Sequence, residues 1–374
     1  MNRQAAGRNM RITIKDVAQM AGVSPSTVSR VLAKDPRISP VTAEKVRQAI
    51  QATHYHPNGI ARSLVRKASL TIGFSVAQPA DQAFASPFVA EALRGAATVA
   101  QRNGYYLMIF TAPTLAEERH HSLTLYREGR IDGVILTTAR VHDTLLDDLR
   151  KEGLPFAVIG RPTGRQVTYW VNNDNVGDAK AATEHLLRLG HRRIGLITGP
   201  RQFVVTQDRT RGFRLAMEEA GASPRLLPHA AGPFTEQGGY QAAAEIIRRQ
   251  PDITALLVTD DVMAVGALRA LADAGRRVPE DVAVMCFNDS PLASAAHPPL
   301  SAVRIPMYEL GARATELLIA VLEGHPPWPG HILLPADMVL RASTGEPAGD
   351  APATAGTVTA GAAGSTAKIP EAAR

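Results

Sequence analysis

From Leu70 to about Leu340, short apolar runs alternate with amphipathic stretches of helical length. Strands that alternate with helices in this way predict parallel sheets of the doubly wound α/β type, with helices on both faces. A region of about 270 residues is too long for one small core, so we expect two lobes. The predicted strands are 71–76, 134–138, 156–159, 194–198, 255–259 and 282–287, and the predicted helices include 176–189, 210–220, 235–249 and 261–274.

Composition restricts the class of protein. Of the 374 residues, 45% are hydrophobic and 20% charged, which is ordinary for a soluble globular protein. No run approaches the roughly 18 consecutive apolar residues of a membrane span. The basic segment from Met1 to Arg11 has no apolar core of a secretory signal. A single cysteine, Cys286, excludes an internal disulfide and a cysteine-based zinc finger. We therefore expect a cytoplasmic protein without membrane association.

The positive charge is concentrated at the N-terminal end of the chain. The net charge is +6, but residues 1–67 carry twelve Lys and Arg against three acidic residues, a net charge of +9, which leaves −3 for the rest. A basic head on a nearly neutral body indicates a polyanionic partner. The alternative is a solvated basic tail, which the signals of ordered structure in the same region disfavour.

Those signals predict three short helices. Thr13 and Asp16 form a helix start, and Gly22 suits the left-handed end of that helix. Ser24-Pro25 and Ser39-Pro40 are start signals for a second and a third helix. Two helices joined by a tight turn form a helix-turn-helix, whose second helix enters the major groove of DNA. A three-helix bundle without a role in nucleic-acid binding is the alternative. The outward face of the second helix carries Pro25, Ser26, Thr27, Ser29 and Arg30.

Residues 12–73 resemble the DNA-binding head of the LacI family of bacterial transcription regulators, without a gap from Ile12 to the first strand of the body. The resemblance places residues 25, 26 and 30 where the recognition helix of the family contacts base edges. Arg30 can donate two hydrogen bonds to a guanine, whereas Pro25 has no side-chain donor.

Residues 57–64 match the hinge helix of the family, which folds only when two copies pack together on DNA. The resemblance implies that Leu64 wedges into the minor groove and kinks the duplex. A buried linker residue is the alternative role for Leu64. The expected DNA contacts from head and hinge are Thr13, Ser24, Pro25, Ser26, Thr27, Ser29, Arg30, Asn58, Ala61 and Leu64.

In the body, polar and aromatic residues follow the predicted strands. Open α/β sheets bind ligands beyond the carboxyl ends of their strands. Thr137, Asp260 and Asn288 lie at such positions, Arg209 is expected to open the helix after strand 194–198, and Phe234 lies in a turn before helix 235–249. Carboxylate and amide groups bind hydroxyls, and an aromatic ring covers the apolar face of a sugar.

Each of these residues also has a purely structural interpretation. Asp260 suits a helix N-cap, Asn288 a turn, and Phe234 the core. Arg209 can pair with Glu218 or Glu219 at the surface. Their convergence on strand ends favours a ligand site.

The resemblance to the LacI family continues to about Ser343 through the segments 185–200, 208–213, 259–271 and 278–289. It implies the fold of periplasmic sugar-binding proteins, with two lobes joined by crossing segments. The effector-binding arginine of the family falls on Arg209 and its aromatic platform on Phe234. The polar pair of the family is usually Asn and then Asp, but this chain has Asp260 and Asn288. The expected effector contacts are Phe88, Thr137, Arg161, Arg209, Phe234, Asp260 and Asn288.

The segment 77–91 is longer than in many members and resembles repressors of α-glucoside or trehalose uptake. We expect residues 1–55 to form the DNA-binding domain, ordered from residue 12, and 56–68 the hinge and linker. Residues 69–345 form the effector-binding and dimerisation core. Its lobe 1 is expected at about 69–171 and 302–331, and its lobe 2 at about 172–301 and 332–345. Ala, Gly, Thr and Pro supply 21 of the 29 residues of 346–374, which predicts a disordered tail.

The function predicted is a homodimeric transcription regulator that binds a pseudo-palindromic double-stranded operator and is released by a mono- or disaccharide. A regulator that needs a corepressor, as in purine-sensing relatives, is the alternative. The chain has no nucleophile elbow, phosphate-binding loop of the Walker type or dinucleotide-binding glycine motif, so we expect no enzyme activity, no cofactor and no metal.

Overall fold

The computed structural model describes residues 12–32, 35–55, 68–141, 143–164, 169–222 and 228–345. The predicted hinge residues Asn58, Ala61 and Leu64 and the predicted tail 346–374 lie outside these ranges. No helix in the described part of the chain has the length and apolar character of a membrane span.

The head contains the three predicted helices: α1 (Ile14–Ala21), α2 (Pro25–Leu32) and α3 (Pro40–Thr53). The carboxylate of Asp16 accepts a hydrogen bond from the backbone N–H of Thr13 at 2.7 Å, and Gly22 ends α1 with φ 67°. Ser39 accepts a hydrogen bond from the backbone N–H of Thr42 and so caps α3. The helices enclose a small core made by Val17, Ala18, Val28, Val46, Ala49 and Tyr55.

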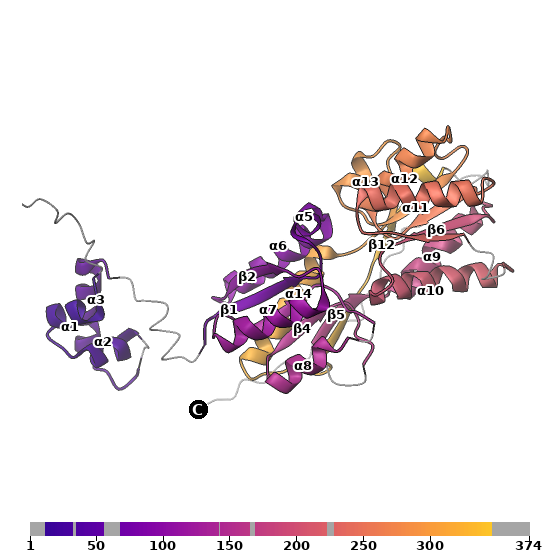
Figure 1. Ribbon diagram of the computed structural model, residues 1–374. Coiled ribbons are helices and arrows are strands. Elements are labelled where there is room, and N and C mark those ends of the chain that lie inside the picture. The colour runs from indigo at the N-terminus through magenta and orange to yellow at the C-terminus, as the bar shows by residue number, and fades with distance from the viewer. Residues whose placement is uncertain are drawn as a thin grey trace, which may run out of the picture.

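Lobe 1 is built on a six-stranded sheet with the order β11-β5-β4-β3-β1-β2, and all its strand pairs are parallel. Helices α6 and α14 pack together on one face, and α7 and α8 on the other (Figure 1). The strands are β1 (Thr71–Val76), β2 (Tyr106–Thr111), β3 (Gly133–Leu136), β4 (Phe156–Ile159), β5 (Tyr169–Asn173) and β11 (His331–Leu334). The helices are α5 (Ala80–Ala85), α6 (Pro87–Arg102), α7 (Leu115–Arg127), α8 (Leu145–Glu152) and α14 (Met307–Leu322).

Lobe 2 has a second six-stranded sheet, ordered β12-β10-β9-β8-β6-β7, in which only the pair of β10 and β12 is antiparallel. Helices α9 and α10 form one packed pair and α11 and α12 another. The strands are β6 (Ile194–Thr198), β7 (His229–Ala231), β8 (Ala255–Val258), β9 (Ala283–Asn288), β10 (Ser301–Arg304) and β12 (Asp337–Val339). The helices are α9 (Asn175–Arg188), α10 (Val204–Glu219), α11 (Glu236–Arg249), α12 (Asp261–Asp273) and α13 (Pro291–Ala295), followed after β12 by the 3-10 helix η2 (Ala342–Thr344).

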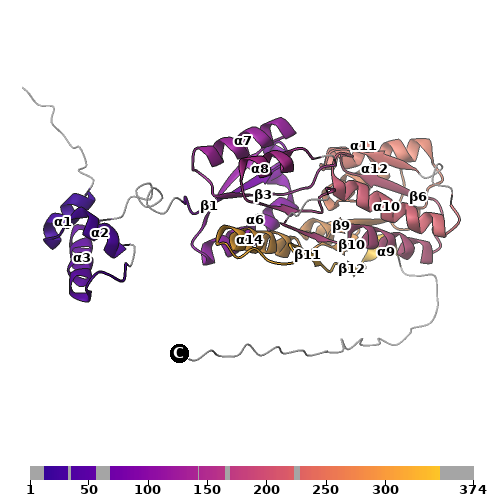
Figure 2. The same ribbon diagram turned by 90° about the horizontal axis from the view of Figure 1, so that it is seen from below.

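The chain crosses between the lobes three times: from β5 to α9, from β10 to α14, and from β11 to β12 (Figures 1 and 2). The lobe bounds expected from the sequence, 172, 302 and 332, fall inside β5, β10 and β11. The crossings therefore lie two or three residues further along the chain than expected, because each strand pairs with its sheet up to its last residue.

The predicted fold class is confirmed, and each of the six predicted strands corresponds to an observed one. The start predicted for α10 was wrong, because this helix begins at Val204 and not at residue 210. Its first turns bury Asp208 and Arg209 together with Val204, so charged residues interrupt the apolar stripe that reveals a helix.

Candidate functional site

All seven effector contacts expected from the sequence line one cavity between the lobes. The cavity spans about 890 Å³ when the open solvent at its entrance is included. Phe88 comes from the first turn of α6, and Thr137 and Arg161 follow β3 and β4 in lobe 1. Lobe 2 contributes Arg209 from α10, Phe234 from the turn before α11, Asp260 from the N-cap of α12 and Asn288 from the end of β9.

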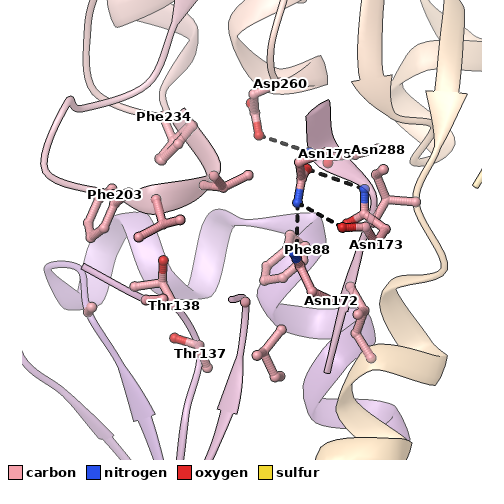
Figure 3. Close-up of a pocket in the computed structure, with 18 of the residues that line it drawn as sticks. Phe88, Thr137, Thr138, Asn172, Asn173, Asn175, Phe203, Phe234, Asp260 and Asn288 are labelled. Carbon is pink, nitrogen blue, oxygen red and sulfur yellow. Dashed lines mark hydrogen bonds between the residues drawn. The ribbon is translucent and has the colours of Figure 1, made fainter. Parts of the chain in front are cut away.

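The cavity has an aromatic side and an amide side. The rings of Phe203 and Phe234 lie together with centroids 6.2 Å apart and planes inclined by 23°. The labelled asparagines lie opposite them, with Phe88 between (Figure 3). Apolar faces on one side and hydrogen-bonding groups on the other suit a ligand with both C–H faces and hydroxyl groups.

Arg209 is buried at the inner side of this cavity and retains 6% of its exposed surface. Its Nε donates to the side-chain oxygen of Asn175 at 2.9 Å and its Nη1 to the carbonyl oxygen of Thr259 at 2.6 Å. The guanidinium lies over the ring of Phe287, 4.2 Å from the centroid. No acceptor among the described residues bonds to Nη2, so this donor is available to a ligand.

Two interpretations of Arg209 from the sequence were wrong. The residue does not open α10, which starts five residues earlier, and it does not pair with Glu218 or Glu219 at the surface. The buried partners Asn175 and Thr259 follow other strands, so they are close to Arg209 only in the folded chain.

Asp260 caps a helix and also lines the cavity. Its Oδ1 accepts a hydrogen bond from the backbone N–H of Met263 at 3.1 Å, which caps α12. Its Oδ2 accepts from the amide of Asn288 at 2.9 Å, so the acid and the amide form one polar unit (Figure 3). Burial, and next the repulsion of Asp261, raise the pKa of Asp260 to about 7. Burial also lowers the pKa of Arg209 to about 10.

Several cavity residues were not anticipated from the sequence. Asn172, Asn173 and Asn175 form a buried cluster at the first crossing, in which the Asn175 amide donates to the side-chain oxygen of Asn172 at 3.0 Å. Phe203 and Asp208 complete the lobe 2 side. The signal was present, because residues 172–175 read NNDN at the end of a strand, but strand 169–173 itself was not predicted.

In the head, the predicted base-contacting residues lie on the exposed side of α2. Pro25, Ser26 and Arg30 are exposed, whereas Thr27 and Ser29 are half-buried. The hydroxyl of Ser24 accepts from the backbone N–H of Thr27 at 3.1 Å, which caps α2, and exposed Thr13 precedes α1. The arrangement of α1 and α2 is the predicted helix-turn-helix, with a polar outward face.

Comparison with known proteins identifies the family. Residues 13–58 match the model for bacterial regulatory proteins of the lacI family, and residues 183–344 match a periplasmic binding protein-like domain. The HTH-type transcriptional regulator CelR of Thermobifida fusca is 36% identical over 340 residues, which cover 90% of this chain and 99% of CelR. The chain belongs to the LacI family. The resemblance seen in the sequence is therefore confirmed, and the protein is a ligand-responsive, DNA-binding transcriptional regulator.

Solved LacI-family structures agree with this fold. A complex of CelR with cellobiose matches with a TM-score of 0.70 and 33% identity, covering 89% of this chain and 100% of that one. The lac repressor dimer bound to operator and the anti-inducer ONPF matches with a TM-score of 0.78 and 25% identity, covering 90% and 99%. A further relative in sequence is the HTH-type transcriptional regulator MalR of Streptococcus pneumoniae. It is 33% identical over 316 residues, which cover 84% of this chain and 93% of MalR.

Proposed function

We propose that the protein is a cytoplasmic, homodimeric repressor whose hold on its operator is relieved by a disaccharide bound between the lobes. The observation that carries this proposal is the convergence of the seven residues expected from the sequence on one cavity between two hinged lobes. The effector changes DNA binding only if it binds one lobe arrangement more tightly than the other.

The chemistry of the cavity supports an uncharged, hydroxyl-rich ligand. Arg161 is paired with Asp208, and Arg209 lies near Asp260, which a pKa of about 7 leaves partly ionised at neutral pH, so the cavity offers little excess charge to an anion. Three aromatic residues, Phe88, Phe203 and Phe234, line the cavity, which suits a ligand with more than one sugar ring. Cellobiose is the first probe, because the CelR complex contains it, and maltose and trehalose follow from the MalR relative and from segment 77–91.

On the DNA side, we propose that two heads bind half-sites of a pseudo-palindrome through α2. Two copies of residues 57–64 would form the hinge helices, with Leu64 in the minor groove. We assign the polar cavity residues to ligand hydroxyls and propose no catalytic step for them.

The test uses the full-length protein and an operator that it selects from random duplexes. Cellobiose, maltose, trehalose, glucose, hypoxanthine and guanine are each added to the complex, and release is followed by fluorescence anisotropy. Release by a disaccharide supports the proposal, whereas tighter binding with a purine supports the corepressor alternative. A ligand that binds also raises the unfolding temperature, by an amount set by its concentration relative to Kd.

Arg209→Ala tests whether the sugar acts from the cavity between the lobes. The variant loses two buried hydrogen bonds and the donor available to the ligand, so we expect the sugar response to fall by about a hundredfold or more. The matched control is Arg211→Ala, an exposed position two residues along α10. Full release of Arg209→Ala at the wild-type sugar concentration would discard the site.

A further inference from the structure

The turn that presents Asn288 to the cavity is strained. Asn288 and Asp289, at the end of β9, have φ values of 88° and 58°, and neither is a glycine. Positive φ is unfavourable for residues with a Cβ, although Asn and Asp tolerate it better than most. Two such residues in succession persist only where their surroundings hold them.

The carboxylate of Asp289 is held by two arginines. Nε of Arg304 donates to Oδ2 at 2.8 Å. Nη1 of Arg341 lies 2.6 Å from Oδ1 in an ion pair without hydrogen-bond geometry, while the same Nη1 donates to the carbonyl oxygen of Leu300. The Asp289 side chain is 3% exposed, whereas the side chains of Arg304 and Arg341 are 53% and 20% exposed, so solvent screens the pair with Arg304 more than the pair with Arg341. We call Asp289, Arg304 and Arg341 the Asp289 clamp.

One of the two arginines lies beside a crossing between the lobes. Arg304 is the last residue of β10, after which the chain passes to α14 in lobe 1. Arg341 follows β12, the strand reached by the crossing from β11. The backbone N–H of Ile305, on the crossing itself, donates to the carbonyl oxygen of Asn288 at 3.3 Å. One carboxylate therefore connects the cavity turn with the crossing from β10 to α14 and with the residue that follows β12.

The other side of the turn is also fixed. The backbone N–H of Ser290 donates to Oδ2 of Asp261 at 2.8 Å, and the Asn288 amide donates to Asp260 (Figure 3). The Asp289 clamp thus lies between the pair of Asn288 and Asp260, which lines the cavity, and the crossing from β10 to α14. Asp289 does not line the cavity, so it acts through Asn288 and not on the ligand.

We propose that Asp289 is a positioning residue: its carboxylate, clamped by Arg304 and Arg341, fixes the Asn288 amide in the effector cavity and couples that turn to the crossing from β10 to α14. This role rests on the proposed sugar response. Loss of the clamp frees the strained turn, so the amide leaves Asp260 and occupancy of the cavity is no longer conveyed to this crossing.

The first experiment measures the cellobiose concentration that releases half of the operator from the full-length protein. Operator affinity without sugar is the reference for each variant. For Asp289→Asn and for Arg304→Gln we expect this concentration to rise by about tenfold or more. Arg304→Lys keeps the charge and should restore most of the response. The control Asp281→Asn breaks an exposed ion pair with Arg277 in the same lobe and should respond as wild type.

A wild-type response in Asp289→Asn would overturn the proposal. An equal rise of the half-release concentration in Arg304→Lys and Arg304→Gln would also overturn it. The proposal requires the positive charge at position 304, which only Lys keeps.

A second experiment separates failure of the clamp from failure of the proposed function. If the wild-type protein binds operator but ignores cellobiose and the other panel ligands, the proposed function fails. The clamp is then judged by ligand-free thermal unfolding of Asp289→Asn, Arg304→Gln and the double variant. We expect the double variant to unfold at the temperature of Asp289→Asn, since the interaction can be lost only once. Additive shifts would overturn the clamp.

Discussion

Asp260, which lines the cavity, shows the electrostatic cost of burying a carboxylate. Burial raises its pKa from 3.8 to about 7, with the repulsion of Asp261 as the next cause. Hydrogen bonds from the backbone of Met263 and Val262 and the charge of Arg209 act in the opposite direction but are weaker. At neutral pH Asp260 is therefore only partly ionised. A ligand hydroxyl that donates a hydrogen bond to its carboxylate would stabilise the ionised form.

This shift predicts how Asp260→Asn changes stability with pH. The folded state holds the proton more tightly than the unfolded state, so Asp260 contributes stability at low pH that is lost as the pH rises through about 7. Asn keeps the N-cap but has no charge to bury. We expect Asp260→Asn to unfold at a higher temperature than wild type at about pH 8, with the difference vanishing near pH 4. Scanning fluorimetry across this range measures it.

Asp281→Asn is the control for this experiment. The Arg277 side chain lowers the pKa of Asp281 to about 2, so the contribution of Asp281 is present above pH 3.8 and lost only as the pH falls through about 2. Its replacement should shift the unfolding temperature equally from about pH 5 to pH 8. Parallel curves for wild type and Asp260→Asn would contradict the burial argument.

The sequence was a good guide to residues at strand ends and a poor guide to residues that act through burial. Thr137, Asp260 and Asn288 follow apolar runs, so the rule for parallel sheets brings them to one edge. Asn175 follows β5, a strand that was not predicted, and Asp208 lies within α10, where nothing local distinguishes it from a solvated polar residue. Their contacts with Arg209 and Arg161 join segments 34 and 47 residues apart, which only the fold defines.

Among the elements, we expect α2 to carry the sequence preference of the head. Arg30 is exposed on its outward face, where a guanidinium can donate two hydrogen bonds to a guanine. We expect Arg30→Ala to lower the preference for operator over unrelated DNA by about 1–3 kcal/mol while leaving salt-sensitive binding to any duplex. Competition titrations at several salt concentrations measure both quantities.

Arg47→Ala is the matched control for Arg30→Ala. Arg47 lies on α3, where it pairs with Glu44 at 2.7 Å. Any affinity that this variant loses should be lost equally on operator and unrelated duplexes. If Arg47→Ala lost the preference for operator and Arg30→Ala kept it, base recognition would belong to α3 and not to α2.

Glycines bring the paired helices of both lobes into close contact. A Cβ at Gly95 of α6 would overlap the carbonyl oxygen of Tyr308 on α14, and one at Gly311 would overlap that of Ala92. Between α11 and α12, a Cβ at Gly239 would overlap the carbonyl oxygen of Met263, and one at Gly266 would overlap that of Glu236. The sequence predicted α11 and α12 from their apolar periodicity, but periodicity does not indicate which helices pair.

We expect Gly266→Ala to destabilise the protein. The added Cβ would overlap the carbonyl oxygen of Glu236, a backbone atom that moves only if α11 and α12 separate. Overpacking of this kind costs about 1–3 kcal/mol, which urea unfolding can measure. Gly164→Ala is the control, because nothing lies within 4 Å of its added Cβ. Equal stability of the two variants would contradict the close contact.

For the whole molecule, alternation of strands and helices was enough to predict two doubly wound lobes. Six strands were not predicted. Four of them, β2, β7, β11 and β12, lie at sheet edges, and three of these four have only three or four residues, whereas β5 and β10 lie inside the sheets. Edge strands are less buried, so their sequences carry a weaker apolar signal. The relative position of the lobes depends on contacts between distant loops, which a sequence pattern does not encode.

Two sets of contacts join the lobes beside the cavity. Nη2 of Arg161 in lobe 1 donates to both oxygens of Asp208 in lobe 2, at 2.8 and 3.1 Å. Beside this ion pair, the backbone of Arg140 and Phe203 forms an antiparallel bridge, and the N–H of Val204 donates to the carbonyl oxygen of Ala139. A more open arrangement would have to break these contacts.

Asp208→Asn is therefore expected to shift the ligand-free lobes toward a more open arrangement. The variant keeps the size of the side chain but removes the charge that pairs with Arg161, so the closed arrangement loses stability. Small-angle scattering of the ligand-free core should give a larger radius of gyration, and saturating effector should restore the wild-type value. Apparent affinity falls with the closed fraction. The control, Glu219→Gln, breaks an ion pair with Lys180 within lobe 2 and leaves the lobe arrangement unchanged. Identical ligand-free scattering of Asp208→Asn and wild type would mean that the backbone bridge alone holds the lobes together.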